Sequence, residues 1–302
     1  MGETQQHRSG FVNIVGKPNA GKSTLMNALV GERMSIITRK PQTTRHRICG
    51  ILSGEDFQIV FSDTPGFVAD PSYKMHSAMN QFIRISFEDA DLILFMVDAT
   101  EPFDATHPII PELQKAKVPI FTVLNKMDLV DEKKIEELIE EIGAILPESE
   151  IVPISALKKK GVDKLMERIN DALPEGPAYY PKDQLTDKPE RFFVSEIIRE
   201  KILDQYHEEI PYSCEIAIES YKEDVSRKGP IIRIRALIYV MRKSQKAIII
   251  GKRGESIKKL GTAARKEIET FLDNHVFLEL HVKVRDNWRD DERMLKYFGY
   301  KQ

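Results

Sequence analysis

The sequence of 302 residues has little cysteine and lacks a long apolar run. Its two cysteines, Cys49 and Cys214, are too few for a disulfide framework, and we expect free thiols in a reducing cytoplasm. The longest strand-like run, at 91–99, is far shorter than the roughly 18 residues of a membrane span. The first ten residues also lack the apolar core of a secretory signal. We therefore expect a cytoplasmic protein.

The sequence also lacks internal repeats and low-complexity segments, and its seven histidines show no spacing typical of a metal site. Hydrophobic residues make up 41% of the chain and charged residues 30%, values that indicate a globular protein. The length suggests two domains of ordinary size.

Charge is divided unevenly along the chain. Residues 1–190 carry 22 Lys and Arg against 29 Asp and Glu, whereas residues 191–302 carry 23 against 18. The basic excess is densest at 242–266, with nine Lys and Arg against the single acidic residue Glu255. A solvated basic face is the ordinary explanation of such a run, but this density favours a polyanionic partner.

The first part of the chain alternates apolar strand-like runs with helical patterns, which predicts an α/β fold with a doubly wound, mostly parallel sheet. Two of the strands, 47–53 and 57–63, are separated by three residues, so we expect a hairpin with one antiparallel edge. The other predicted strands are 11–16, 91–98, 118–126 and 150–156, and the predicted helices are 22–31, 73–89, 106–116, 132–145 and 161–172.

The second part has a different order of elements. Four prolines at 173–189 indicate a linker. After it the pattern predicts α-β-β-α-α-β, an α+β fold. The elements are a helix at 191–207, strands at 213–221 and 231–240 joined by a polar loop at 222–229, a short apolar helix or strand end at 245–250, a helix at 255–272 and a strand at 277–284. We therefore divide the chain into domains at 9–174 and 191–302 with a linker at 175–190.

A phosphate-binding pattern, Gly-x-x-x-x-Gly-Lys-Ser, runs from Gly16 to Ser23, directly after a predicted strand and at the start of a predicted helix. The backbone N–H groups of such a loop can surround phosphate oxygens, and the helix N-terminus adds its positive end. We expect Lys22 to reach the outer phosphates and Ser23 to bind Mg²⁺. The nucleotide-binding candidates in this loop are Gly16, Asn19, Ala20, Gly21, Lys22, Ser23 and Thr24.

Three further motifs lie at the carboxyl ends of predicted strands, where open α/β sheets bind ligands. In "DTPG", 63–66, Asp63 can hold a metal through water and Gly66 can turn its N–H toward a terminal phosphate. In "NKMD", 125–128, the carboxylate of Asp128 can accept hydrogen bonds from N1–H and the 2-amino group of guanine, a donor pair that adenine lacks. "SAL", 155–157, can offer backbone N–H to the guanine oxygen. The base-side candidates are Asn125, Lys126, Asp128, Ser155, Ala156 and Leu157.

In the order and spacing of these motifs, residues 11–173 resemble the translation-factor-related GTPases, which have a Ras-like P-loop domain. The switch segment "KPQTTRHR", 40–47, fits the same pattern. The resemblance implies Mg²⁺-dependent hydrolysis of GTP to GDP, with Lys22, Thr44 and Gly66 as the candidate catalytic residues. It also implies that Thr44 is the Mg²⁺ ligand that senses the terminal phosphate. The adjacent Thr43 remains an alternative, because the threonine doublet leaves the alignment ambiguous by one residue.

Two residues depart from the Ras-type pattern. Phe67 follows Gly66, where Ras-type enzymes carry a glutamine that orients the attacking water. Because phenylalanine cannot hydrogen-bond water, we expect its side chain to pack away from the phosphates. A backbone group or an added cation must then assist, or turnover is slow. GTPases that resemble this one, with Asn at the position of Asn19, often use K⁺ in place of an arginine finger, which makes K⁺ a candidate cofactor.

A second glycine turn, Gly251-Lys252-Arg253-Gly254, follows the apolar run at 247–250. Gly-x-x-Gly between two helices is typical of KH domains, which clamp the backbone of about four unpaired nucleotides. A purely structural basic turn is an alternative. A second nucleotide site is disfavoured, because the turn lacks the Gly-Lys-Ser spacing and a hydroxyl for Mg²⁺. The RNA-binding candidates are Lys246, Gly251, Lys252, Arg253, Gly254 and Lys258. Near the end of the chain, we expect Trp288 to pack the last helix on the second domain, and a direct RNA contact is the alternative.

A GTPase domain followed by one KH domain of type II resembles the Era family over nearly the whole chain. The resemblance implies a monomeric GTP-hydrolysing switch that binds the 3′ end of 16S ribosomal RNA and acts in assembly of the small (30S) ribosomal subunit. Two other functions remain open. One is an RNA-binding regulator with little turnover. The other is a regulatory GTPase that lies peripherally at the inner membrane and applies its basic face to anionic lipid.

Overall fold

The computed structural model describes residues 7–38, 40–226 and 229–301. Its contacts divide the chain into two compact units. The first unit comprises Met1–Ser72 and His76–Asp187, and the second comprises Tyr73–Met75 and Lys188–Gln302. The main division therefore falls between residues 187 and 188.

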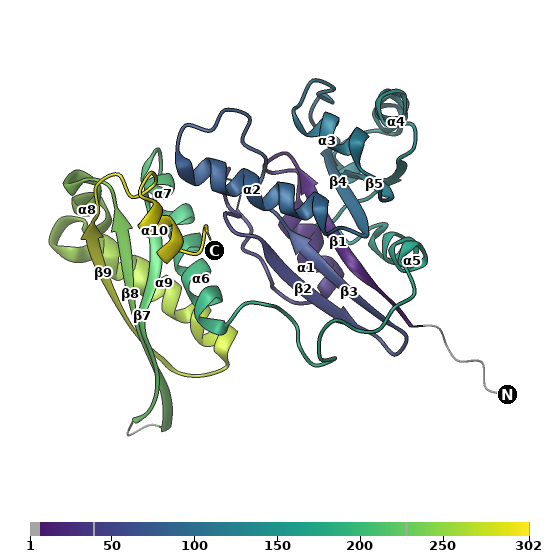
Figure 1. Cartoon of the computed structure of the whole chain (residues 1–302). Helices are drawn as coiled ribbons and strands as arrows, with labels where there is room; N and C mark the ends of the chain where they lie inside the picture. Colours follow the sequence, from purple (N-terminus) through teal and green to yellow (C-terminus); the bar gives the residue numbers. More distant parts are fainter. Residues whose placement is uncertain (1–6, 39, 227–228, 302) are drawn as a thin grey trace. The chain divides into compact units, whose positions relative to one another are not determined.

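The first unit is built on a six-stranded sheet of order β2-β3-β1-β4-β5-β6 (Figure 1). Strand β1 pairs in parallel with both β3 and β4, and β2 pairs with β3 in the antiparallel direction. The predicted parallel sheet and its antiparallel edge are thereby confirmed. The strands are β1 Arg8–Gly16, β2 Ile48–Ser53, β3 Phe57–Asp63, β4 Leu92–Asp98, β5 Ile120–Asn125 and β6 Glu150–Pro153.

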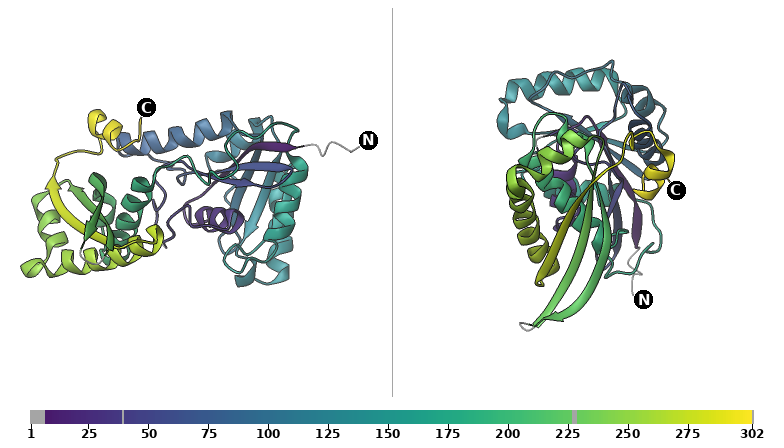
Figure 2. Two further views of the ribbon diagram at one scale, coloured as in Figure 1. Left: turned by 90° about the horizontal axis from the view of Figure 1, so that it is seen from below. Right: turned by 90° about the vertical axis from the view of Figure 1, so that its left-hand side faces the viewer.

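Helices cover both faces of this sheet, which explains why the strands are apolar runs rather than alternating patterns. Figure 2 shows α1 and α2 on opposite faces of the sheet. Side chains of α3 and α4, such as Leu113 and Ile142, share a core with Ile93 of β4. The helices are α1 Lys22–Val30, α2 Lys74–Glu88, α3 Ile109–Lys115, α4 Glu132–Ile145 and α5 Val162–Ala172, with a 3₁₀ turn, η1, at Met127–Leu129.

The stretch predicted as a linker contains a short segment, residues 185–187, that lies along strand β2. The Ile51 N–H donates to the Leu185 carbonyl at 2.8 Å, and the Cys49 N–H donates to Asp187 at 3.1 Å. Thr186 in turn donates its hydroxyl to the Cys49 carbonyl at 2.7 Å. Because β2 is at the edge of the sheet, these bonds satisfy backbone groups that would otherwise be unpaired.

The second unit has a three-stranded sheet of order β7-β8-β9, with β7 antiparallel and β9 parallel to β8. Residues of helices α6, α8 and α9 form one core with the sheet, including Ile198, Ile249 and Ile268. The elements are α6 Glu190–Gln205, α7 Ile210–Ser213, β7 Glu215–Ser226, β8 Gly229–Val240, α8 Lys243–Ile250, η2 Lys252–Gly254, α9 Glu255–Leu272, β9 Val276–Val284 and α10 Glu292–Tyr297. This is the predicted α-β-β-α-α-β order with the short α7 added.

One predicted loop is wrong. The polar stretch at 222–229 continues the two strands to Ser226 and from Gly229, as a ribbon that extends beyond the helices (Figure 1). Polar side chains can line a solvated ribbon as easily as a loop, and here they pair across it. Arg233 contacts Asp224 at 2.6 Å on the neighbouring strand.

The last residues pack onto the second unit. Trp288 is fully buried, and its indole N–H donates to the Ser213 carbonyl at 3.0 Å. The ring also meets Phe298 edge to face, with centroids 5.3 Å apart. The predicted packing role of Trp288 is confirmed.

Both cysteines are buried free thiols, as expected. Among the helices of residues 7–38, 40–226 and 229–301, we find none with the length and apolar character needed to span a bilayer.

Candidate functional site

The phosphate loop joins β1 to α1 and requires its glycines. A Cβ atom at Gly16 would lie 2.5 Å from the Met96 carbonyl oxygen, and one at Gly21 would lie 2.2 Å from the amide nitrogen of Asn125. Gly21 also has φ 98°, a left-handed conformation that favours glycine. Within the described chain, no side chain caps the start of α1, which leaves its first N–H groups for an anion.

Lys22 is buried at the base of this loop. Its ammonium group donates to the carbonyl oxygens of Gly16 at 3.2 Å and Lys17 at 2.8 Å. Burial lowers the pKa of Lys22 to about 8, and the nearby carboxylate of Asp63 opposes that shift. A phosphate dianion in the loop would supply the opposite charge that a buried ammonium group needs.

Three oxygen-bearing side chains from separate segments meet beside Lys22. The Ser23 hydroxyl donates to Asp63 at 2.6 Å and lies 2.9 Å from the hydroxyl of Thr44, which itself donates to Asp63 at 3.2 Å. Burial raises the pKa of Asp63, while Lys22 and the Ser23 hydroxyl act in the opposite direction. The structure therefore brings together all three residues predicted as metal ligands.

This cluster fits Mg²⁺. Hydroxyl and carboxylate oxygens are the ligands that this ion prefers. Asp63 Oδ1 is buried and has no hydrogen-bond partner among the described residues, so it retains an acceptor for a metal-bound water. The described residues contain no group of three or more His, Cys, Asp or Glu that could hold a metal ion, so this cluster of two hydroxyls and one carboxylate is the candidate.

The two threonines of the switch segment, Thr43 and Thr44, have different hydrogen-bond partners. The Thr43 hydroxyl donates to the Lys40 carbonyl at 2.6 Å and lies 2.7 Å from the Thr38 hydroxyl. The Thr44 hydroxyl instead contacts Ser23 and Asp63. This arrangement favours Thr44 as the metal ligand.

Asn125 ties two loops of the site together. Its amide nitrogen donates to the Ala20 carbonyl at 2.8 Å, and its amide oxygen accepts from the Ala156 N–H at 2.9 Å. The sequence predicted that Asn125 and Ala156 contact the nucleotide. It did not predict that Asn125 links the phosphate loop to the "SAL" segment through these two hydrogen bonds. The contact joins residues more than 100 positions apart, and no local pattern indicates it.

The base-side residues differ in exposure. Asp128 is exposed after β5, and Leu157 after β6 has an exposed fraction of 77%. Lys126 forms an ion pair with the buried Asp98, which sequence reasoning also missed. An exposed carboxylate and an exposed large apolar side chain, which follow the two neighbouring strands β5 and β6, suit a base with a polar edge and an apolar face. Of the remaining loop candidates, Ala20 and Ser155 are buried, Thr24 is half-buried and Asn19 is exposed.

The "DTPG" segment packs closely on the phosphate loop. A Cβ at Gly66 would lie 2.7 to 2.9 Å from atoms of Pro18, so only glycine allows this approach. Phe67, the next residue, packs against the apolar core, and its ring meets His107 edge to face at 5.6 Å. The structure thus places the half-buried Phe67 side chain against apolar residues, whereas the expectation concerned its direction relative to the phosphates.

The second glycine turn separates α8 from α9. Gly251 and Gly254 have φ values of 72° and 81°, and Arg253 between them has φ 53°. Lys252, Arg253 and Lys258 are exposed, and Lys246 is half-buried. Of the apolar run, Ile249 is buried in the core, whereas Ile248 keeps half of its surface exposed beside the turn. The turn thus presents two glycine backbones and two cationic side chains.

Comparison with known proteins identifies the family. Residues 11–126 match the family model described as a 50S ribosome-binding GTPase, and residues 209–289 match the KH domain. GTPase Era of Geotalea uraniireducens (strain Rf4) is 47% identical over 297 residues, which cover 98% of this chain and 99% of that protein. The chain belongs to the Era family of GTPases. The chloroplastic GTPase ERA1 of Zea mays is also 47% identical, over 97% of this chain and 71% of its own length.

Solved structures agree with this assignment. A crystal structure of Era in complex with MgGDPNP and nucleotides 1506–1542 of 16S ribosomal RNA matches with a TM-score of 0.92 and 40% identity, covering 98% of this chain and 100% of that one. A variant of Aquifex aeolicus Era bound to GDP·AlF₄⁻ matches with a TM-score of 0.91, 41% identity and the same coverage. The predicted fold, a P-loop GTPase domain followed by a KH domain, is confirmed, and so is the resemblance.

Base selection by Asp128 can be tested by exchanging its carboxylate for an amide. An amide offers one acceptor and one donor, which suits the N1–H and 2-oxo groups of xanthine instead of guanine. We expect Asp128→Asn to weaken GDP binding by about 100-fold or more and to strengthen XDP binding. Competition against a fluorescent nucleotide measures both affinities.

The matched control is Asp131→Asn. Asp131 caps α4 by accepting from the Lys134 N–H at 2.9 Å, and asparagine caps helices equally well. Nucleotide preference should not change in this control. An Asp128→Asn protein that still prefers GDP over XDP as strongly as the wild type would show that Asp128 does not select the base.

Proposed function

We propose that this chain is a GTP-hydrolysing molecular switch that binds the 3′ end of 16S ribosomal RNA and acts in assembly of the small ribosomal subunit. The observation that carries the proposal is the joining of Thr44, from the switch segment, to Ser23 and Asp63 beside the phosphate loop. The basic Gly-x-x-Gly turn in the same chain, and the Era complex that contains nucleotides 1506–1542 of 16S RNA, support the RNA target.

Each residue of the nucleotide site has a role in this mechanism. Ser23 and Thr44 would hold Mg²⁺ directly, and Asp63 would hold it through water. When bound, the ion would offset the negative charge of the phosphate oxygens. The Lys22 ammonium group exchanges its two loop carbonyls for oxygens of the outer phosphates, and the Gly66 N–H donates to the terminal phosphate. Thr44 keeps its segment ordered only while these partners are present, so loss of the phosphate releases the segment.

We also propose that K⁺ assists hydrolysis. Phe67 packs into the core and has no group that can orient water, so another source must stabilise the charge that develops. Asn19 is an exposed residue of the phosphate loop with φ 62°, and it bears an amide oxygen of the kind that binds monovalent cations.

A phosphate-release assay tests turnover and the cation together. With GTP and Mg²⁺ we expect release of phosphate that is about tenfold or more faster in K⁺ than in Na⁺ at equal ionic strength. Asn19→Ala should remove most of the difference. Equal rates in the two salts would refute the role of K⁺, and failure to release phosphate in either salt would favour an RNA-binding regulator with little turnover.

The glycine turn of the second unit suits an RNA backbone. Gly251 and Gly254 let the main chain approach phosphates, and Lys252 and Arg253 offer charge at the tip of the turn. Because exposed cationic side chains would neutralise RNA phosphates, we expect the affinity for RNA to fall as the salt concentration rises. Ile248, half exposed beside the turn, offers an apolar surface to an unstacked base.

Reversing the charge at the tip tests this contact. We expect Lys252→Asp with Arg253→Asp to weaken binding of an RNA spanning nucleotides 1506–1542 by about 30-fold or more. The matched control is Lys133→Asp with Lys134→Asp, which makes the same change in net charge at one exposed and one half-buried position of α4. Fluorescence anisotropy at fixed salt measures both.

The control should bind RNA nearly as tightly as the wild type. If both double variants lose RNA affinity equally, the turn is not a clamp. Anionic vesicles in a parallel assay address the membrane alternative. Vesicle binding that is stronger than RNA binding and is lost in both variants would favour a basic face directed at lipid.

A further inference from the structure

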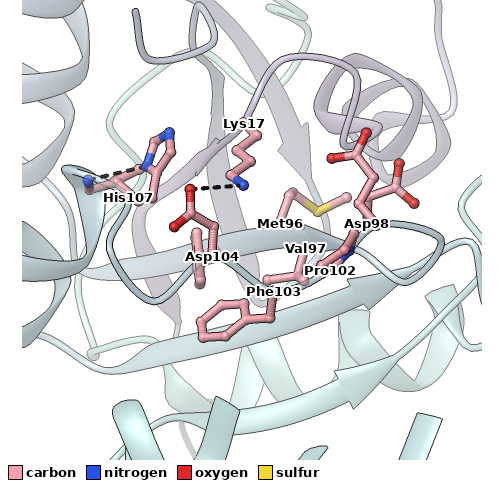
Figure 3. A pocket seen from close by; sticks show the side chains of 11 residues that line it. Lys17, Met96, Val97, Asp98, Pro102, Phe103, Asp104 and His107 are labelled. Atoms are coloured by element: carbon pink, nitrogen blue, oxygen red, sulfur yellow. Dashed lines mark hydrogen bonds and ion pairs between the residues drawn. The ribbon is translucent and has the colours of Figure 1, made fainter. Parts of the chain in front are cut away.

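A pocket beside the phosphate loop is unexplained by nucleotide binding. It is lined by Lys17 of the loop, the carboxyl end of β4 and the turn before α3 (Figure 3). Within the described chain, none of the predicted nucleotide-binding residues lines it. Lys17 therefore faces away from the predicted contacts, although it lies between Gly16 and the other residues of the loop.

Both the side chain and the backbone carbonyl of Lys17 have polar partners. Its ammonium group forms an ion pair with Asp104 at 3.3 Å, as Figure 3 shows. Its backbone carbonyl accepts from the Lys22 ammonium group at 2.8 Å. Lys17 thus connects the lysine expected to contact the outer phosphates with the turn at 104–107.

That turn is held in one conformation. Asp104 accepts from the backbone N–H of Thr106 at 3.1 Å and from its hydroxyl at 2.7 Å. The Thr106 hydroxyl and, to a smaller extent, Lys17 hold the pKa of Asp104 below its ordinary value, so its carboxyl group is ionised at neutral pH. The His107 N–H donates to the Asp104 carbonyl at 3.2 Å, which closes the turn.

The other end of the turn supports Phe67. The His107 ring meets the Phe67 ring edge to face, and its Nδ1 accepts from the Ile109 N–H at 3.3 Å. Burial and the positive charge of Lys17 lower the pKa of His107, so the ring is neutral at pH 7. One turn therefore contacts both the phosphate loop, through Asp104, and the segment that follows Gly66, through His107.

We propose that Lys17 is a positioning residue for GTP hydrolysis, whose ion pair with Asp104 sets the phosphate loop relative to the segment that carries Gly66 and Phe67. Since Phe67 cannot hydrogen-bond water, orientation of the attacking water depends on backbone groups and on the relative placement of these two segments. Misplacement by about 1 Å can cost a large part of the rate. The proposal rests on the proposed GTPase function.

The ion pair should matter more for the rate than for stability. The two side chains are 34% and 39% exposed, and ion pairs of this kind contribute little to stability because water screens them. A loss of hydrolysis without a loss of fold is thus the signature that separates positioning from a structural role.

The test compares Lys17→Met, Asp104→Asn, their combination and Lys17→Arg. We expect each of the first two to slow single-turnover phosphate release at saturating GTP by about tenfold, with GDP affinity changed less than about threefold. The double variant should be no slower than the slower single variant, because both changes remove one interaction. Lys17→Arg keeps the charge and should retain most of the rate.

The matched control is Lys133→Met, which removes the exposed ion pair with Glu137 on α4. It should hydrolyse GTP at the wild-type rate. Wild-type rates for Lys17→Met and Asp104→Asn would overturn the proposal, as would multiplicative slowing in the double variant. A parallel loss of GDP affinity or of the unfolding midpoint would assign Lys17 a structural role and equally overturn it. If the wild type itself releases no phosphate, the proposed function fails instead.

Discussion

The nucleotide site is organised by one buried carboxylate. Asp63 lies at the carboxyl end of β3 with no exposed surface, and a buried charge needs polar partners. Ser23 from the start of α1 and Thr44 from the switch segment supply hydroxyls, and both contacts converge on its Oδ2 atom. Because Thr44 belongs to an irregular segment, the position of that segment depends on what Asp63 and its neighbours hold. A cation held by Ser23, Thr44 and Asp63 would therefore restrict the position of the switch segment.

The rest of the first unit holds the residues of this cluster in position. Parallel strands bring the residues after β1, β3, β5 and β6 to one edge of the sheet. Asn125 then fixes the phosphate loop to the "SAL" segment through two hydrogen bonds, and the turn at 104–107 contacts the loop from another direction. The nucleotide contacts thus rest on side chains that reach across the sheet edge.

The two glycine turns, at 16–21 and 251–254, share the same backbone chemistry but suit different ligands. The phosphate loop combines its glycines with the buried ammonium group of Lys22 and the hydroxyl of Ser23. This combination suits a small nucleotide with its metal ion. In the turn at 251–254, both cationic side chains, Lys252 and Arg253, are exposed. Exposed charge suits a polymer whose phosphates lie at the surface and whose binding is screened by salt.

Sequence patterns predicted the sheet of the first unit and the order of elements in both units, because apolar periodicity and glycine spacing are local signals. They did not predict the ribbon beyond Tyr221, since polar residues in a solvated ribbon resemble those in a loop. They also missed the segment at 185–187 along β2 and the two hydrogen bonds of Asn125, which join residues far apart in the sequence. The sequence also could not distinguish Thr43 from Thr44, because the two are adjacent and a shift of one residue changes which hydroxyl faces Asp63.

Thr44 is the residue through which we propose that the switch segment senses the terminal phosphate and the metal ion. The most direct test is backbone hydrogen exchange of residues 40–47, measured with saturating GDP and with a non-hydrolysable GTP analogue. We expect slower exchange with the analogue than with GDP for the wild type and for Thr43→Ala, and equal exchange in the two states for Thr44→Ala. A Thr44→Ala protein that retains the full difference between the two states would contradict this role.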